Sequence, residues 1–283
     1  MRKLYFFILA IVLCSFVNGQ AYARILFHDD FDSYSDAPSN HGWTGGTSAN
    51  FSMQNTSGVN NSRCIMVTYN RSGTEPYWFG KNISNENMQE IFVRFYFKME
   101  TPNGASIKHL KLFGKQFSPE GYANSTFALS NGSLWDIGYG NGNGTQNDTQ
   151  YTIRYSGPHY ASDPALEWRK STSTLFVADN KWHCMEVHMK YNSNDKRDGL
   201  YQVWIDGELR LDVANVKNRH NSNSLHFRSV ELANYCDVNF TQPFRVWYDN
   251  IVISDQYIGT IESNESIDNI APATPTGLNV ISK

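Results

Sequence analysis

The sequence predicts an all-β protein, built as a sandwich or barrel of one domain. Short stretches in which apolar and polar residues alternate recur along the chain, and loops rich in Gly, Asn and Ser separate them. Aromatic residues make up 14% of the 283 residues, a share typical of β-rich proteins. No stretch shows the spacing of a long helix, and no alternation of strands with helices indicates a parallel sheet.

The N-terminal residues have the pattern of a secretory leader. A basic start at residues 1–3 precedes an apolar stretch over residues 4–17, which is too short for a transmembrane helix. Ala21-Tyr22-Ala23 has the small-x-small form that signal peptidase cleaves. We therefore expect a signal peptide over residues 1–23 and a secreted mature chain, extracellular or periplasmic, that begins at Arg24.

The clearest alternation lies in residues 91–99 and 182–191. One face of each stretch is apolar, and the other carries Arg94, Tyr96 and Lys98 in the first and Glu186, His188 and Lys190 in the second. Asp206-Gly207 predicts a tight hairpin between strands at 201–205 and 208–213. Further strands are expected over residues 109–113, 126–129, 151–155, 225–232 and 244–253.

The balance of charges limits the classes of binding partner that we expect. The 24 Lys and Arg nearly balance 27 Asp and Glu, so bulk charge gives no reason to expect nucleic acid or a membrane surface as partner. We expect a monomer that binds neither.

Without the leader the chain retains Cys64, Cys184 and Cys236, which allow at most one internal disulfide, and the pairing stays open.

The C-terminal residues change in composition. Residues 260–270 are polar, and residues 271–278 carry Pro and Thr in the manner of an extended linker. This segment resembles the start of a fibronectin type III domain. We expect residues 260–283 to be a disordered tail and residues 24–259 to form the folded domain.

Three segments together resemble the concanavalin A-like lectin/glucanase superfamily. They are Asp29-Asp30-Phe31-Asp32 with Trp43 shortly after, residues 181–208, and the closing strand at residues 246–253. The resemblance implies a jelly-roll sandwich of two antiparallel sheets over roughly residues 27–258. This superfamily includes lectins, glycosidases, lyases and binding modules, so the fold leaves the activity open.

The absence of several motifs disfavours other enzymatic activities. A retaining glucanase of this fold would carry a Glu-x-Asp-x-Glu run on one strand, and the sequence has none. It also lacks a Gly-x-Ser-x-Gly elbow, a His-Glu-x-x-His pair and a phosphate-binding Gly loop. A glycoside hydrolase with separated carboxylates is the third-ranked alternative.

A polysaccharide lyase has different requirements. Elimination beside a uronic acid needs a group that neutralises the carboxylate, a base and an acid. If the polar faces of the strands share one sheet, they form a groove suited to an acidic glycan, similar to that of alginate and glucuronan lyases. The expected catalytic residues are Arg94, Tyr96, Lys111 and His188. The expected substrate-binding residues are His109, Glu186, Lys190, Gln202 and Trp204.

Their roles follow from their chemistry. Arg94 and Lys111 are expected to neutralise the uronate, and Tyr96 and His188 to act as base and acid in an order that stays open. This requires Arg94, Tyr96, His188 and Trp204 to lie on a solvent-facing side of one sheet. The alternative is a lectin-like module without catalysis that stacks glycan on Trp204.

The resemblance also implies a structural Ca²⁺ site that joins the first and last strands. Asp30, Asp32 and Asp249 are placed for it, and their alternative role is to cap turns or to pair with Arg. The expected chemistry requires no cofactor.

Overall fold

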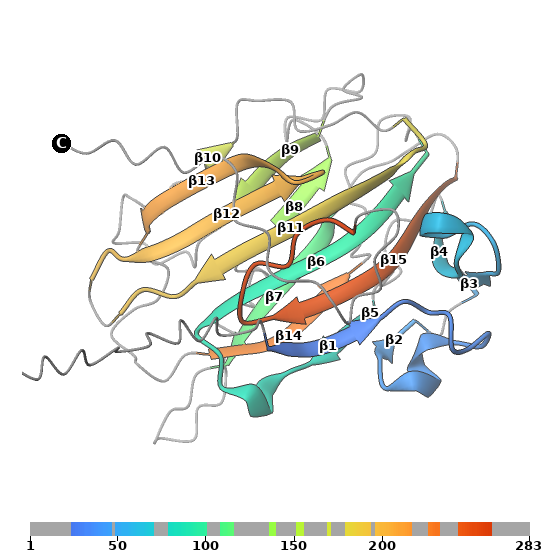
Figure 1. Ribbon diagram of the computed structural model, residues 1–283, viewed down its shortest axis with the longest axis horizontal. Helices are drawn as coiled ribbons and strands as arrows, with labels where there is room; N and C mark the ends of the chain where they lie inside the picture. Colours follow the sequence, from blue (N-terminus) through green and yellow to red (C-terminus); the bar gives the residue numbers. More distant parts are fainter. Residues whose placement is uncertain are drawn as a thin grey trace, which may run out of the picture.

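The computed structural model is a sandwich of two antiparallel sheets, which confirms the predicted all-β jelly roll (Figure 1). The described residues are 24–46, 49–70, 79–100, 108–115, 136–139, 151–155, 169–170, 179–193, 196–216, 226–232 and 243–261. The expected signal peptide, the strand expected at 126–129 and residues 262–283 lie outside them. Within these ranges no helix is long and apolar enough to cross a membrane.

One sheet, called sheet A here, contains eight strands within the described residues. Its order is β13-β12-β11-β6-β15-β4-β3, and β1 also pairs with β15. The bounds are β1 (Ile25–Asp29), β3 (Phe51–Gln54), β4 (Cys64–Tyr69), β6 (Glu90–Met99), β11 (Trp182–Lys190), β12 (Gly199–Ile205), β13 (Glu208–Val216) and β15 (Phe244–Ser254).

The opposite sheet, sheet B, has the order β10-β9-β8-β7-β14-β5-β2. Its strands are β2 (Thr44–Gly45), β5 (Phe79–Asn82), β7 (Lys108–Lys115), β8 (Asp136–Tyr139), β9 (Tyr151–Tyr155), β10 (Arg169–Lys170) and β14 (His226–Leu232). Short 3₁₀ turns lie in the connections: η1 (Pro38–His41), η2 (Val59–Asn61) and η3 (Ser84–Glu86).

The hydrophobic core lies between the sheets. Alternate residues of each strand point into it, as the period of two requires. Sheet A contributes Val93, Phe95, Met185, Val187, Val203 and Ile205, and sheet B contributes Phe79, Phe227, Val230 and Leu232. The strands predicted at 91–99, 182–191 and 201–205 therefore share one sheet and place the expected apolar face inward.

The hairpin predicted at Asp206-Gly207 is present. Both residues have positive φ, 52° and 80°, as a type I′ turn requires. Asp206 tolerates this conformation because its carboxylate accepts a hydrogen bond from the backbone N–H of Cys184 at 2.8 Å. Cys184 and Cys64 are buried free thiols, and burial raises the pKa of each to about 12.

Candidate functional site

The predicted catalytic cluster is divided between the two sheets. Arg94, Tyr96 and His188 lie on β6 and β11 of sheet A, whereas His109 and Lys111 lie on β7 of sheet B. The expectation that all these strands share one groove is wrong. The chain crosses from one sheet to the other between β6 and β7, and β6 pairs instead with β11 and β15.

The solvent exposure predicted for the sheet A residues is also wrong. Arg94 is 0% exposed, Tyr96 7%, and His188 and Trp204 5% each. Their positions do lie on the side of sheet A that faces away from the main core, so the predicted parity was right. Residues 255–261, called the strap here, run back over this side after β15 and cover it (Figure 1).

Hydrogen bonds fix the strap to residues predicted to act on substrate. The two carboxylate oxygens of Glu186 accept from the N–H groups of Ile258 and Gly259, each at 2.7 Å. Arg94 Nη1 donates to the carbonyl of Gly259 at 3.1 Å, and Tyr96 Oη accepts from Ile261 N at 2.6 Å. Glu186, Arg94 and Tyr96 therefore bind the protein's own backbone.

Apolar contacts complete this cover. Ile258 is 3% exposed and packs with Phe92, Trp204 and Val252, and the ring of Tyr257 lies 4.9 Å from that of Trp204. The indole of Trp204 is therefore not available as a sugar platform, and the lectin-like alternative built on it is wrong for this face.

The side chain of His188 is held by contacts with neighbouring residues of sheet A. Its Nδ1 lies 2.8 Å from Gln202 Oε1, its Nε2 lies 2.8 Å from Glu90 Oε1, and its ring stacks on Phe92. Lys190 pairs with the other oxygen of Glu90 at 3.0 Å. Both imidazole nitrogens have partners within the sheet, so His188 has a structural role here and does not face a substrate.

The three carboxylates expected to bind calcium cap turns. Asp249 accepts from Val59 N and Ser62 Oγ, both at 2.8 Å, and burial raises its pKa to about 7. Asp32 accepts from Arg63 N at 2.7 Å, and Asp30 accepts from Asp32 N at 3.0 Å. At least one oxygen of each carboxylate therefore accepts a hydrogen bond from the turn that it caps.

Among the described residues, no group of three or more His, Cys, Asp or Glu is arranged to hold a metal. The hydrogen bonds favour the capping role for the three aspartates. Calcium binding stays an untested prediction.

The remaining predicted residues lead to sheet B. In the strand register, Lys111 is opposite Asp136 of β8 on one side and opposite Glu231 of β14 on the other. Asp136 pairs in turn with Arg154 of β9, and Arg154 with Lys170 of β10. These five positions form one continuous row across sheet B, called the charged row below.

The row belongs to the outer face of sheet B. Successive residues of a strand alternate between faces, and residues opposite each other share one. The neighbouring row is apolar, with Leu110 opposite both Leu232 and Ile137. Leu232 is fully buried in the core between the sheets. The charged row therefore occupies the face turned away from that core.

A register irregularity lies beside the charged row. Lys108 pairs with Gly138 and Leu110 with Ile137, so His109 is an additional residue on β7. Bulges of this kind re-aim side chains and are frequent beside active sites. His109 and Lys111 are thus the two predicted site residues on sheet B. Sequence reasoning missed Asp136, Arg154, Lys170 and Glu231, because only the pairing of the strands places them beside Lys111.

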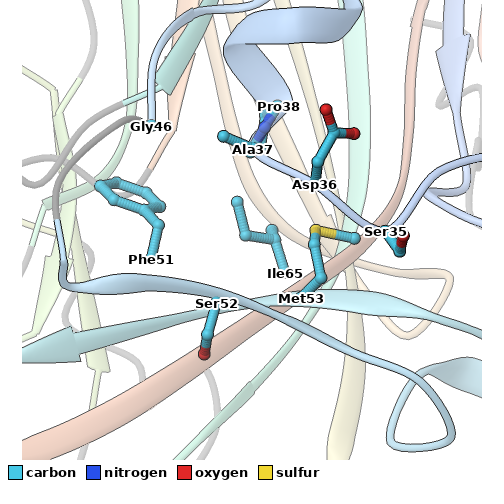
Figure 2. Close-up of a pocket in the computed structure, with 9 residues that line it drawn as sticks. All are labelled: Ser35, Asp36, Ala37, Pro38, Gly46, Phe51, Ser52, Met53 and Ile65. Carbon is cyan, nitrogen blue, oxygen red and sulfur yellow. The ribbon is translucent and has the colours of Figure 1, made fainter.

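Two other sites deserve comparison, the first being a hollow of about 230 Å³ beside β3 (Figure 2). It is lined by Ser35, Asp36, Ala37, Pro38, Gly46, Phe51, Ser52, Met53 and Ile65. Its one charged lining residue, as far as the structure describes it, is Asp36, which is bonded to Asn40 at 2.7 Å and to His41. An anionic sugar would meet a carboxylate there, so the hollow does not suit an acidic glycan.

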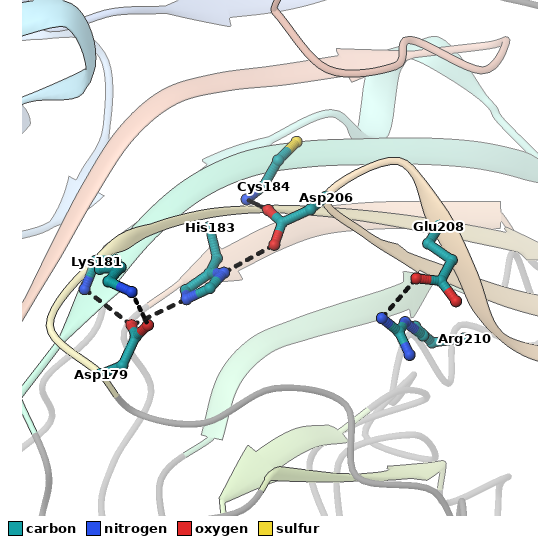
Figure 3. Close-up of polar contacts among 7 residues, drawn as sticks. All are labelled: Asp179, Lys181, His183, Cys184, Asp206, Glu208 and Arg210. Atoms are coloured by element: carbon teal, nitrogen blue, oxygen red, sulfur yellow. Dashed lines mark hydrogen bonds and ion pairs between the residues drawn. The ribbon is translucent and has the colours of Figure 1, made fainter.

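The second is a polar cluster at the tip of the β12–β13 hairpin (Figure 3). His183 lies between two carboxylates, with Nδ1 2.8 Å from Asp206 and Nε2 3.1 Å from Asp179. The hydrogen bond to Asp206, more than any other contact, raises the pKa of His183 above its usual value. The cluster fastens the hairpin turn to the start of β11, which is a structural role.

Replacing His183 with glutamine is expected to remove a pH-dependent part of the stability. Because the folded-state pKa exceeds that of the unfolded chain, this contribution is complete below about pH 6.5 and is lost as the pH rises through the raised value. We expect H183Q to cost about 1 kcal/mol at pH 6 and less at pH 9, measured by urea unfolding.

Arg210→Gln is the matched control, because it removes the neighbouring Arg210–Glu208 ion pair on the same hairpin (Figure 3). Its effect should be equal at the two pH values. A loss of stability in H183Q that is the same at both pH values would contradict the role of the charged His183 in fastening the hairpin.

Comparison with known proteins agrees with this fold. The endo-β-1,4-glucuronan lyase of the fungus Trichoderma reesei superposes with a TM-score of 0.52 at 17% identity, over 83% of this chain and 97% of that one. The PL-14 alginate lyase of Aplysia kurodai gives 0.58 at 15% identity, over 82% and 99%. Alginate lyase Aly36B gives 0.56 at 11% identity, over 80% and 95%.

Identities this low establish the fold alone, and no curated protein matches the sequence significantly. The polysaccharide lyase family model, in contrast, matches residues 94–252, which is more than half of the chain. This match includes β6 from Arg94 onward and the whole of β7, β8, β9, β10 and β14, and with them the charged row. The chain belongs to the polysaccharide lyase family.

Proposed function

We propose that the protein cleaves a uronate-containing polysaccharide by β-elimination on the outer face of sheet B. The observation that carries this proposal is the pairing of strands that places Lys111, Arg154 and Lys170 in one row. Cations spaced across a sheet attract and orient a chain of carboxylates. The solved relatives named above are lyases of alginate and glucuronan, both polymers of uronic acids, which supports the same substrate class.

The proposed reaction needs a cation and a base. Lys111 neutralises the uronate carboxylate, so that the adjacent C–H becomes acidic. His109, at the bulge, removes that proton, and the electron pair forms a carbon–carbon double bond as the glycosidic C–O bond breaks. The leaving oxygen then takes the proton back from the imidazolium of His109. The products are one saturated end and one unsaturated uronate.

His109 is proposed because of its side chain and its place. Imidazole is the side chain whose ordinary pKa lies nearest neutrality, as a proton-transfer group requires. His188, the base or acid first expected, is 5% exposed and held within sheet A. Tyr96 is bonded to the strap. Neither can meet a glycan that lies on sheet B.

We also propose that the enzyme acts outside the cell, in the extracellular or periplasmic space. The basic start, apolar stretch and Ala21-Tyr22-Ala23 site support export. Large acidic polysaccharides are themselves extracellular materials. The carboxylates of such a polymer are the groups that the cationic positions of the charged row would bind.

Incubation with a panel of polysaccharides tests this proposal. The purified protein is mixed with alginate, glucuronan and glycosaminoglycans, and the ultraviolet absorbance of unsaturated uronate is followed. We expect it to rise with at least one acidic glycan and to stay flat with a neutral glucan. Reducing ends without unsaturation would indicate hydrolysis instead, and no product on any acidic glycan would overturn the proposal.

A further inference from the structure

Lys111 lies between two carboxylate-bearing positions. Asp136 is its partner on β8 and Glu231 its partner on β14, and both pairings are direct. Directly opposite residues on neighbouring antiparallel strands have Cβ atoms about 5 Å apart. The register therefore places an acid on each side of Lys111 at the same level of the sheet.

The structure makes room for one of these acids. A Cβ atom added to Gly80 of β5 would lie 2.7 Å from Cγ of Glu231 and 3.0 Å from the carbonyl of Val230. Gly80 is the partner of Glu231 on the side away from Lys111. Any larger residue at position 80 would displace the Glu231 side chain, so the place of this carboxylate depends on the glycine.

Two neighbouring anions have a definite effect on an amine. Opposite charges favour the protonated form, so a lysine between two carboxylates stays charged to higher pH. A lysine that acts as a base needs the reverse, a depressed pKa produced by burial or by nearby cations. Acids on both sides of Lys111 therefore favour a lysine that binds an anion over a lysine that removes a proton.

The other titratable residues of β7 and β14 are not opposite Lys111 in the register. The strand β14 also carries His226 and the exposed Arg228, and β7 itself carries Lys108, His109 and Lys115. None of them is opposite Lys111 in the register, and Arg154 is separated from it by Asp136. The two directly opposite groups on the paired strands are both acids.

We propose that Asp136 and Glu231 are positioning residues that keep Lys111 a cation, so that Lys111 clamps the uronate and does not serve as the base. This inference rests on the proposed function, since it assigns roles within the same site. It leaves proton removal to a different group, for which His109 is the candidate on the same strand.

The pH dependence of Glu231→Gln tests the inference on a glycan that the wild type cleaves. We expect activity at alkaline pH to be lost about one pH unit earlier than in wild type, whereas kcat/KM at neutral pH changes little, because an ordinary lysine is still protonated there. Glu231→Asp should restore most of the alkaline activity. Asp136→Asn, on the other flank, should shift the profile in the same direction.

The opposite role for Lys111 gives the opposite result. If Lys111 were the base, removing an anion would ease its deprotonation, and E231Q would gain activity at neutral and acidic pH. That gain, or a profile that does not move in either variant, would overturn the inference. Glu208→Gln, on exposed β13 of sheet A, is the control and should match wild type. A wild-type protein without lyase activity would instead refute the proposed function.

Discussion

Replacing Lys111 with alanine is expected to lower kcat/KM for glycan cleavage by about 100- to 1,000-fold. The variant loses the cation that stabilises the charge formed beside the uronate, and removing one such group from an active site costs that much in other enzymes. Lys111→Arg keeps the charge but changes its shape, and should retain part of the activity. Initial rates of unsaturated uronate formation provide the measurement.

Lys190→Ala is the matched control. Lys190 was also expected to touch substrate, but it lies on sheet A, with 44% of its side chain exposed and its ammonium paired with Glu90. We expect its kcat/KM to stay within about twofold of wild type, because surface ion pairs contribute little. Equal losses in K111A and K190A, or an active K111A, would place the reaction elsewhere.

The sequence contained enough information for most of the fold. The alternation in residues 91–99 and 182–191 fixed which residues of β6 and β11 face the core, because a slip of one residue would exchange the two faces. The hairpin at Asp206-Gly207 was predictable from turn chemistry alone. Several strands were not predicted: β2, β3, β4, β5, β8 and β10. Apart from β4, which has six residues, they have two to four residues each, too few to show a period.

The candidate site was harder to predict for two physical reasons. Period two assigns residues to a face of a strand but not to a sheet, so Lys111 and Arg94 looked like neighbours although they lie on opposite sheets. The position of the strap could not be predicted from the pattern of residues either. It binds Glu186 and Arg94 through backbone N–H and C=O groups, which every sequence supplies.

Replacing Glu186 with alanine is expected to lower the free energy of unfolding by about 3–5 kcal/mol. The variant leaves the N–H groups of Ile258 and Gly259 without acceptors under the strap, and it removes a carboxylate next to the fully buried Arg94. Ile258→Ala should cost about 2–4 kcal/mol through the cavity that it opens beside Phe92 and Trp204. Urea unfolding at neutral pH measures both losses.

Glu208→Ala is the control, because 67% of the Glu208 side chain is exposed and its loss should change stability by less than about 0.5 kcal/mol. The pH dependence supplies a second criterion. Burial raises the pKa of Glu186 to about 7, above the value near 4.5 of an unfolded chain. The native state therefore binds more protons, and this residue's contribution to stability falls as the pH rises from about 4.5 to 7. E186A should lack that decline, and an E186A protein as stable as wild type would show that the strap is not held by Glu186.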